Sequence, residues 1–177
     1  MKKKTLALVL ALTLLVAGIV GGTLAWLTDQ TAEVKNTFTV GDINISLTET
    51  TADYKMVPGN TIAKDPTVTV KANSEACWLF VQVTESTDLK DFITYAIAEG
   101  WTALPGVDGV YYREVPTSAA DQTFSVLAGD AVTVKSDVTR TMLETAKTDA
   151  PTLTFKAYAI QKDHFATADA AWAEVSK

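Results

Sequence analysis

Four apolar residues follow one another directly at Trp78-Leu79-Phe80-Val81. Successive side chains of a β-strand point to opposite faces of a sheet, so a strand with this run needs cover on both faces. In several other short segments apolar positions alternate with polar ones, as a strand with one solvent-exposed face requires. The run therefore predicts the central strand of a β-rich domain, over residues 77–83.

An alternating segment earlier in the chain contains a break in its phase. The pair Phe38 and Val40 differs in parity from the apolar set that begins at Ile43. A one-residue shift moves a whole set of side chains to the other face of a sheet. We therefore expect Gly41-Asp42 to form a bulge or tight turn that restores one apolar face.

Alternation, turn residues and helical spacing predict the remaining elements. In the first part of the domain we expect a turn at Pro58-Gly59, a strand after Pro66, and a helical turn after Leu89 followed by a strand that ends at Gly100. Hairpins are expected at 104–112 and across Gly129-Asp130, and a short helix around Met142. The chain is then expected to form a strand from Leu153 to Ala159 and a helix at 167–176, capped by Thr167 and anchored by Trp172. Eight or nine short strands predict an all-β, two-sheet antiparallel sandwich, jelly-roll-like or immunoglobulin-like, with one or two short helices.

The first 25 residues have the pattern of a secretory signal peptide, which adds an N-terminal signal helix to this fold. Residues 2–4 are lysines, and the run 6–20 that follows is apolar except for one threonine. Small residues stand at Thr23 and Ala25, the two positions expected before a cut. Cleavage between Ala25 and Trp26 is predicted.

An uncleaved membrane anchor is the alternative. No charged residue occurs from Thr5 through Thr28, and these 24 residues could cross a bilayer core, which needs roughly 20. In either case the remainder of the chain is predicted to work outside the cytoplasm.

Removal of residues 1–25 leaves 152 residues, the usual size of one domain, and changes the net charge from −6 to −9 because three lysines are lost. A net-negative chain without a basic run is repelled by phosphates, so nucleic acid and anionic membranes are excluded as partners. Cys77 is the only cysteine, which rules out an intramolecular disulfide. We expect a buried, inert thiol, with intermolecular pairing or a nucleophile as alternatives.

The residues that carry common catalytic chemistry are scarce. The one histidine, His164, stands in a polar stretch, and neither G-x-S-x-G nor H-E-x-x-H occurs. The aspartates at 29, 42, 53 and 65 are scattered at expected turns, where capping is their commoner role. We therefore predict no catalytic residue, no cofactor and no metal site.

Three segments resemble the TasA/camelysin family of bacterial exported proteins, whose signal is of the kind that the SipW signal peptidase cuts. The segments are residues 22–29 (GTLAWLTD), 36–45 (NTFTVGDINI) and 57–65 (VPGNTIAKD). The resemblance is strongest over residues 1–83 and weaker at 153–161.

The resemblance implies a jelly-roll-like sandwich and, for the best-known members, a subunit of matrix or cell-surface fibres. In such fibres the N-terminal segment of one subunit is laid as a donor strand into its neighbour. In this chain that role would fall to residues 26–36, with Trp26, Leu27, Thr28 and Val34 as the assembly-strand residues. Camelysin-type relatives carry a metalloprotease label, for which this chain has no zinc-ligand pattern.

The leading hypothesis is a non-catalytic, secreted structural protein of the bacterial cell surface or biofilm matrix. It would self-associate head to tail, with the signal peptidase as a partner during export and the membrane involved only before cleavage. A monomeric surface-binding or adhesin module is the first alternative, and a secreted endopeptidase is the second.

Overall fold

The computed structural model describes Lys3 and residues 41–50 and 54–177. The chain divides into two compact units, Met1–Thr39 and Val40–Lys177, and all the described strands belong to the second. The predicted signal peptide, its cleavage site and residues 26–36 lie outside the described residues.

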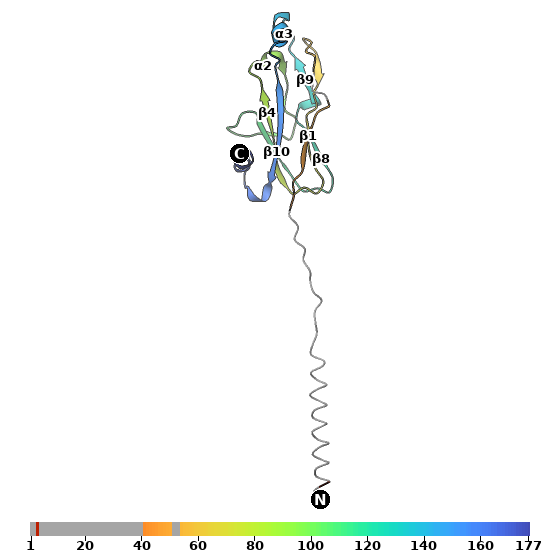
Figure 1. Cartoon of the computed structure of the whole chain (residues 1–177), viewed down its shortest axis with the longest axis vertical. Helices are drawn as coiled ribbons and strands as arrows, with labels where there is room; N and C mark the ends of the chain where they lie inside the picture. The colour runs from red at the N-terminus through yellow and green to blue at the C-terminus, as the bar shows by residue number, and fades with distance from the viewer. Residues whose placement is uncertain (1–2, 4–40, 51–53) are drawn as a thin grey trace. The chain divides into compact units, whose positions relative to one another are not determined.

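The described strands form three antiparallel sheets (Figure 1). One sheet has the order β1-β3-β8, with β1 (Ile45–Thr48), β3 (Thr67–Val70) and β8 (Gln122–Ser125). The second has the order β10-β4-β7-β6, with β10 (Leu153–Gln161), β4 (Cys77–Glu85), β7 (Val110–Val115) and β6 (Thr102–Ala103). The third has the order β2-β9-β5, with β2 (Thr61–Ala63), β9 (Ala131–Val134) and β5 (Ile93–Thr94). The predicted all-β, antiparallel class is confirmed.

Two of these sheets pack against one face of the four-stranded sheet. A first core lies between the four-stranded sheet and the β1-β3-β8 sheet, and a second core lies under the β2-β9-β5 sheet. Leu153 and Phe155 of β10 contact both cores. The four-stranded sheet is therefore one layer of the sandwich. The other layer consists of the two three-stranded sheets, placed one after the other, so the two layers contain three sheets.

Strand β4 is the central strand that its apolar run predicted. It pairs with β10 along one edge and with β7 along the other. Leu79 and Val81 belong to the core between the sheets, whereas Trp78 and Phe80 belong to a third core on the opposite face. Full burial of a large apolar side chain stabilises the fold by about 1.5–3 kcal/mol, so this strand contributes on both faces.

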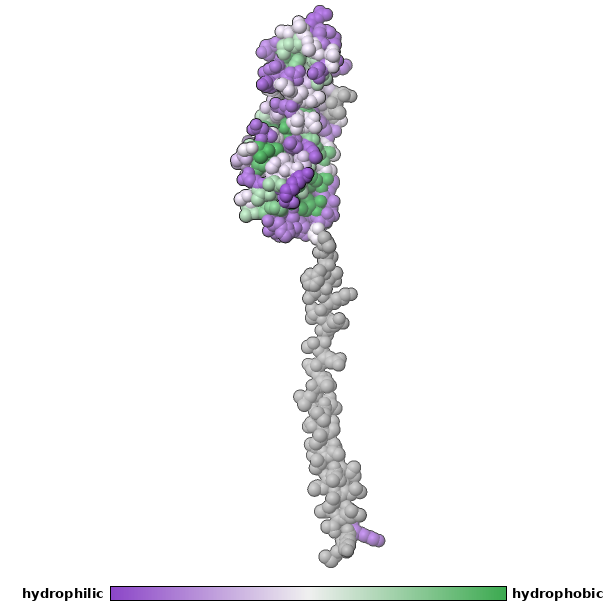
Figure 2. Space-filling model, turned by 60° about the vertical axis from the view of Figure 1, so that its left-hand side comes forward, coloured by the Kyte–Doolittle hydropathy of each residue, from purple (hydrophilic) through white to green (hydrophobic). Residues whose placement is uncertain are grey.

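The C-terminal helix α4 (Ala168–Val175) covers the outer face of the four-stranded sheet, as predicted. Its N-cap is Thr167, whose hydroxyl accepts a hydrogen bond from the backbone N–H of Ala170. The Trp172 ring lies 5.3 Å from the Phe80 ring and 5.1 Å from the Tyr158 ring, between centroids. Figure 2 shows separate hydrophobic patches among hydrophilic side chains on this side of the molecule.

The predicted hairpin across Gly129-Asp130 is wrong. Strand β8 pairs with β3, whereas β9 pairs with β2 and β5, so the two strands belong to different sheets. The 3-10 turn η1 (Ala128–Asp130) connects them, with φ of 65° at Gly129 and 49° at Asp130. These positive φ angles carry the backbone from one sheet into the next and do not close a hairpin.

The hairpin at 104–112, the helical turn after Leu89 and the helix around Met142 are confirmed, whereas the strand predicted to end at Gly100 ends at Thr94. Gly41 and Asp42 form no turn among the described residues, and Phe38 and Val40 lie outside them, so the predicted bulge is not tested. A hairpin joins β6 to β7, and Gly109 takes a φ of 71° at its end. The short helices are α2 (Leu89–Phe92) and α3 (Arg140–Ala146), and the 3-10 turn η2 (Lys162–His164) follows β10. The predicted turn at Pro58-Gly59 is present.

Candidate functional site

Three strands at the edges of their sheets approach one another on one side of the sandwich. Within the described residues, β10 is hydrogen-bonded along one edge only, to β4, and β1 and β2 are likewise edge strands. Strand β1 lies beside β10 without pairing with it (Figure 1). An unpaired edge presents a row of backbone N–H and C=O groups to any strand that comes close.

Two cavities open beside this edge. The larger, of about 430 Å³, is bounded mainly by apolar side chains from several elements, among them Met56, Ile62, Leu89, Ile93, Val132 and Leu153. The smaller, of about 350 Å³, lies between the end of β1 and the start of β10. Lys64, Leu153 and Thr154 line both cavities, so we name the two together the β10 groove.

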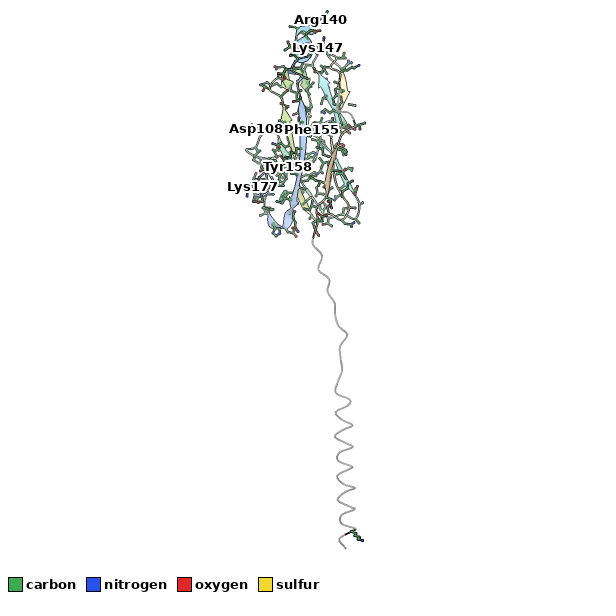
Figure 3. All side chains as sticks on the ribbon, viewed as in Figure 1. Asp108, Arg140, Lys147, Phe155, Tyr158 and Lys177 are labelled. Carbon is green, nitrogen blue, oxygen red and sulfur yellow. The ribbon has the colours of Figure 1, made fainter. Side chains whose placement is uncertain are left out.

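Lys64 is the one charged residue that is buried within the described part of the chain, with an exposed fraction of 7%. Its Nζ lies 2.6 Å from Oε1 of Glu49 and over the rings of Tyr54 and Phe155, at 4.7 and 5.4 Å from their centroids. Figure 3 labels Phe155 on β10. The lysine is thus held in the groove by a carboxylate and two aromatic faces, as a buried cation requires.

The surroundings of Lys64 also affect neighbouring ionisable groups. Burial, followed by a hydrogen bond from its hydroxyl to Glu49 at 2.7 Å, raises the pKa of Tyr54. Asp65 accepts hydrogen bonds from the hydroxyl and, at 3.0 Å, from the backbone N–H of Thr50. These bonds lower the pKa of Asp65, and they tether the chain after β1 to the segment after β2.

The arrangement suits binding of an extended segment better than bond-making chemistry. The groove offers unpaired strand edges, apolar walls and one cation whose charge is already balanced. Backbone hydrogen bonds of the edge would supply affinity, and the cavities would receive alternate side chains of the bound segment.

His164 and Cys77 are the two side chains that the sequence offered for base or nucleophile chemistry, and the structure places neither of them in the β10 groove. His164 is exposed on η2. Cys77 is fully buried on β4, and burial raises the pKa of its thiol to about 11, so the reactive thiolate is disfavoured. The predicted buried thiol is confirmed.

The predicted site residues are not tested by the structure. Ala25, Trp26, Leu27, Thr28 and Val34 all lie outside the described residues. Lys64 and Glu49 were missed by sequence reasoning, because a single lysine after a strand is typical of a solvated position. The signal that could have found Lys64 is its place in the segment 57–65, which also carried the family resemblance.

The fold and the groove together define a small antiparallel β-sandwich with an open edge. Residues 1–87 of this chain match the family model described as camelysin metallo-endopeptidase. No curated protein and no solved structure matches the chain. This match, whose residues end just after β4, confirms the resemblance to the TasA/camelysin family over residues 1–87.

The family description implies a metal ion, which needs several donor side chains close together. In residues 41–50 and 54–177, no three side chains of His, Cys, Asp or Glu lie close enough together to hold a metal. The single histidine of the chain also rules out a pair of histidine ligands. The side chains that the structure describes therefore do not fit a zinc-protease centre.

No described helix is both long enough and apolar enough to cross a membrane.

Proposed function

We propose that this chain is a non-catalytic, secreted structural protein of the bacterial cell surface or biofilm matrix. Residues 26–36 of one copy are added as a donor strand to the β10 groove of the next. The observation that carries this proposal is the edge of β10 that no other described strand pairs with, flanked by two cavities and by two further edge strands.

Strand addition suits this groove on physical grounds. A nine-residue strand that is paired on one side leaves hydrogen-bonding capacity on the other. Residues 26–36 alternate in part, with Thr28, Ala32 and Val34 on one face. Because the donor and the groove are different surfaces of the same chain, the contact is head to tail, and such a contact gives a filament when its rotation does not close a ring.

Export and assembly are coupled in this proposal. Cleavage after Ala25 by a signal peptidase frees Trp26 as the new N-terminus and makes the donor segment available outside the cell. A chain that keeps residues 1–25 retains a membrane-inserting segment next to the donor strand, so premature assembly is restrained.

The test compares residues 26–177 with a chain that lacks residues 26–36. Both are incubated over a concentration series and analysed by sedimentation and negative-stain microscopy. Filaments are expected only from the longer chain. A Thr31→Pro variant, which removes a ladder hydrogen bond, should assemble poorly, and Thr31→Ser is its matched control. Soluble monomers from every chain would contradict the proposal.

A monomeric binding module is the second candidate, favoured by a hollow of about 510 Å³ beside the ends of β4 and β7. The hollow is lined by aromatic and polar side chains, among them Gln82, Tyr95, Tyr111 and the exposed Asp108. Such a mixture suits a glycan or a protein loop. Binding by a chain that stays monomeric at all concentrations would support this candidate, and loss of binding in Asp108→Ala with unchanged stability would locate it.

A further inference from the structure

We propose that the end of the domain around α3 is a docking surface for the opposite end of a second copy. The α3 end comprises α3 and residues 55–60. The loop end comprises residues 41–44, 71–76, 114–121 and 161–165. This inference rests on the proposed head-to-tail assembly and names a second contact within it.

A hollow at the α3 end carries most of the charge for this contact. It has a volume of about 490 Å³ and is bounded by Lys55, Met56, Arg140, Leu143, Glu144, Ala146 and Lys147. Three of these are cations and one is a carboxylate. Figure 3 labels Arg140 and Lys147 at this end of the described unit.

Two of the three cations have no ion-pair partner within the described residues. Lys147 pairs with Glu144 one helical turn away, at 2.7 Å between Nζ and Oε2. Lys55 and Arg140 are exposed and form no ion pair there. Beside the hollow, Val57 is 49% exposed, the large hydrophobic residue most open to solvent in the described part. An apolar centre with a charged rim is the usual anatomy of a protein interface.

The loop end has the complementary charge. The pairing of Gln161 with Cys77, of Cys77 with Val115 and of Ile45 with Val70 brings its four segments to one end of the sandwich. It carries five carboxylates, Asp42, Glu75, Glu114, Asp121 and Asp163, against the two lysines Lys71 and Lys162.

Both lysines of the loop end are already committed. Lys71 pairs with Asp121 at 3.0 Å, and Lys162 pairs with Glu114. Asp42, Glu75 and Asp163 therefore remain without a lysine partner within the described residues. Within the described residues Lys55 and Arg140 at the α3 end, flanked in sequence by Asp137 and Asp149, form no ion pair, and neither do Asp42, Glu75 and Asp163 at the loop end. The unpaired groups that the two ends offer to a second copy are therefore opposite in sign.

The order of the chain brings these two ends together. Met56 lines both the α3-end hollow and the β10 groove, so the hollow adjoins the groove. Residues 37–44 link the donor segment to β1 and span at most about 28 Å when extended. A copy whose residues 26–36 occupy the groove is therefore held with its loop end close to the α3 end of its neighbour.

Charge reversal tests this contact in the chain of residues 26–177. The α3-end variant carries Lys55→Glu and Arg140→Glu, and the loop-end variant carries Asp42→Lys and Asp163→Lys. Each is expected to raise the critical concentration for filaments about tenfold, or roughly 1.4 kcal/mol. A chain with all four changes restores complementarity and should recover assembly. Raising the salt should reduce these differences, since exposed charges are screened.

Thermal unfolding checks that the variants fold, and zero-length carbodiimide cross-linking gives an independent readout. Cross-links from Lys55 or Lys147 to Asp42, Glu75 or Asp163 of another copy are expected. If the α3-end variant and the loop-end variant both assemble like the original chain, and no such cross-links form, the docking surface is overturned. Filaments that need residues 26–36 would in that case still support the donor strand. End-to-end cross-links together with filaments in a chain that lacks residues 26–36 would support the docking surface and refute the donor strand.

Discussion

Strands β4 and β10 are neighbours in one sheet, yet they have opposite surroundings. β4 is hydrogen-bonded on both edges and covered on both faces, and six of its first seven residues are buried. β10 has one paired edge in the described residues, and its other edge borders two cavities and a buried lysine. The closed strand contributes most to the stability of the domain, and the open one is the edge that we propose binds another strand.

The largest effect is expected from truncation in the closed strand. Phe80→Ala removes a fully buried ring and should lower the free energy of unfolding by about 3–5 kcal/mol. Phe155→Ala, at the groove, should cost clearly less because that side chain is only half-buried and already borders a cavity. Urea unfolding of both variants measures the contrast. Equal losses would show that the groove is packed as tightly as the core.

Gly109 tests how closely β7 approaches β4. A methyl group there would lie 2.4 Å from the Val83 carbonyl oxygen, at a φ of +71°. Gly109→Ala should therefore cost about 3 kcal/mol, the sum of positive-φ strain and a backbone clash. Gly59→Ala is the matched control, since its φ is +79° with no atom within 4 Å of the added carbon. If Gly59→Ala loses as much stability as Gly109→Ala, the short distance to the Val83 carbonyl oxygen is not the cause of the loss.

The buried ion pair of the groove should respond asymmetrically. Glu49→Gln leaves the Lys64 ammonium buried without its carboxylate and should cost about 2 kcal/mol, less than for a fully buried pair because a quarter of Glu49 is exposed. Lys64→Met keeps the apolar stem and leaves Glu49 able to reach water, so its cost should be smaller. Chemical denaturation of both and of the double variant separates these effects, and a larger loss from Lys64→Met would contradict the assignment.

The smallest effect concerns pH at the rim of the groove. The folded-state pKa of Asp65 is below its unfolded value, so its hydrogen bonds to Thr50 stabilise the fold above pH ~4. That contribution is lost as the pH falls through the folded-state pKa. Asp65→Asn should be less stable than the original chain at pH 7 and equal to it near the acid limit. A stability difference between Asp65→Asn and the original chain that stays the same at every pH would contradict this prediction.

The closed part of the fold was largely predictable, for a simple physical reason. A run such as Trp78-Leu79-Phe80-Val81 must be covered on both faces, and alternation with turn residues marks the strands around it. Thr167 and Trp172 likewise marked the cap and anchor of α4. These features depend on residues that are close together in the sequence, so the sequence alone is enough to predict them.

The open part was not predictable, because it depends on which strands become edges. Nothing local in residues 153–161 shows that β10 is paired on one side only. The buried position of Lys64 results from contacts with Glu49 and Phe155, which are distant in the chain. The turn at Gly129-Asp130 was misjudged for the same reason, since positive φ angles suit a hairpin and a change of sheet equally well.

Amide hydrogen exchange of β10 during assembly tests the central claim most directly. Residues 26–177 would be compared, as monomer and after assembly, with a chain that lacks residues 26–36. The account predicts new protection in the first half of β10, next to the groove, only in the longer chain, while β4 stays protected throughout. Assembly that leaves the exchange of β10 unchanged would contradict the claim that its open edge receives the donor strand.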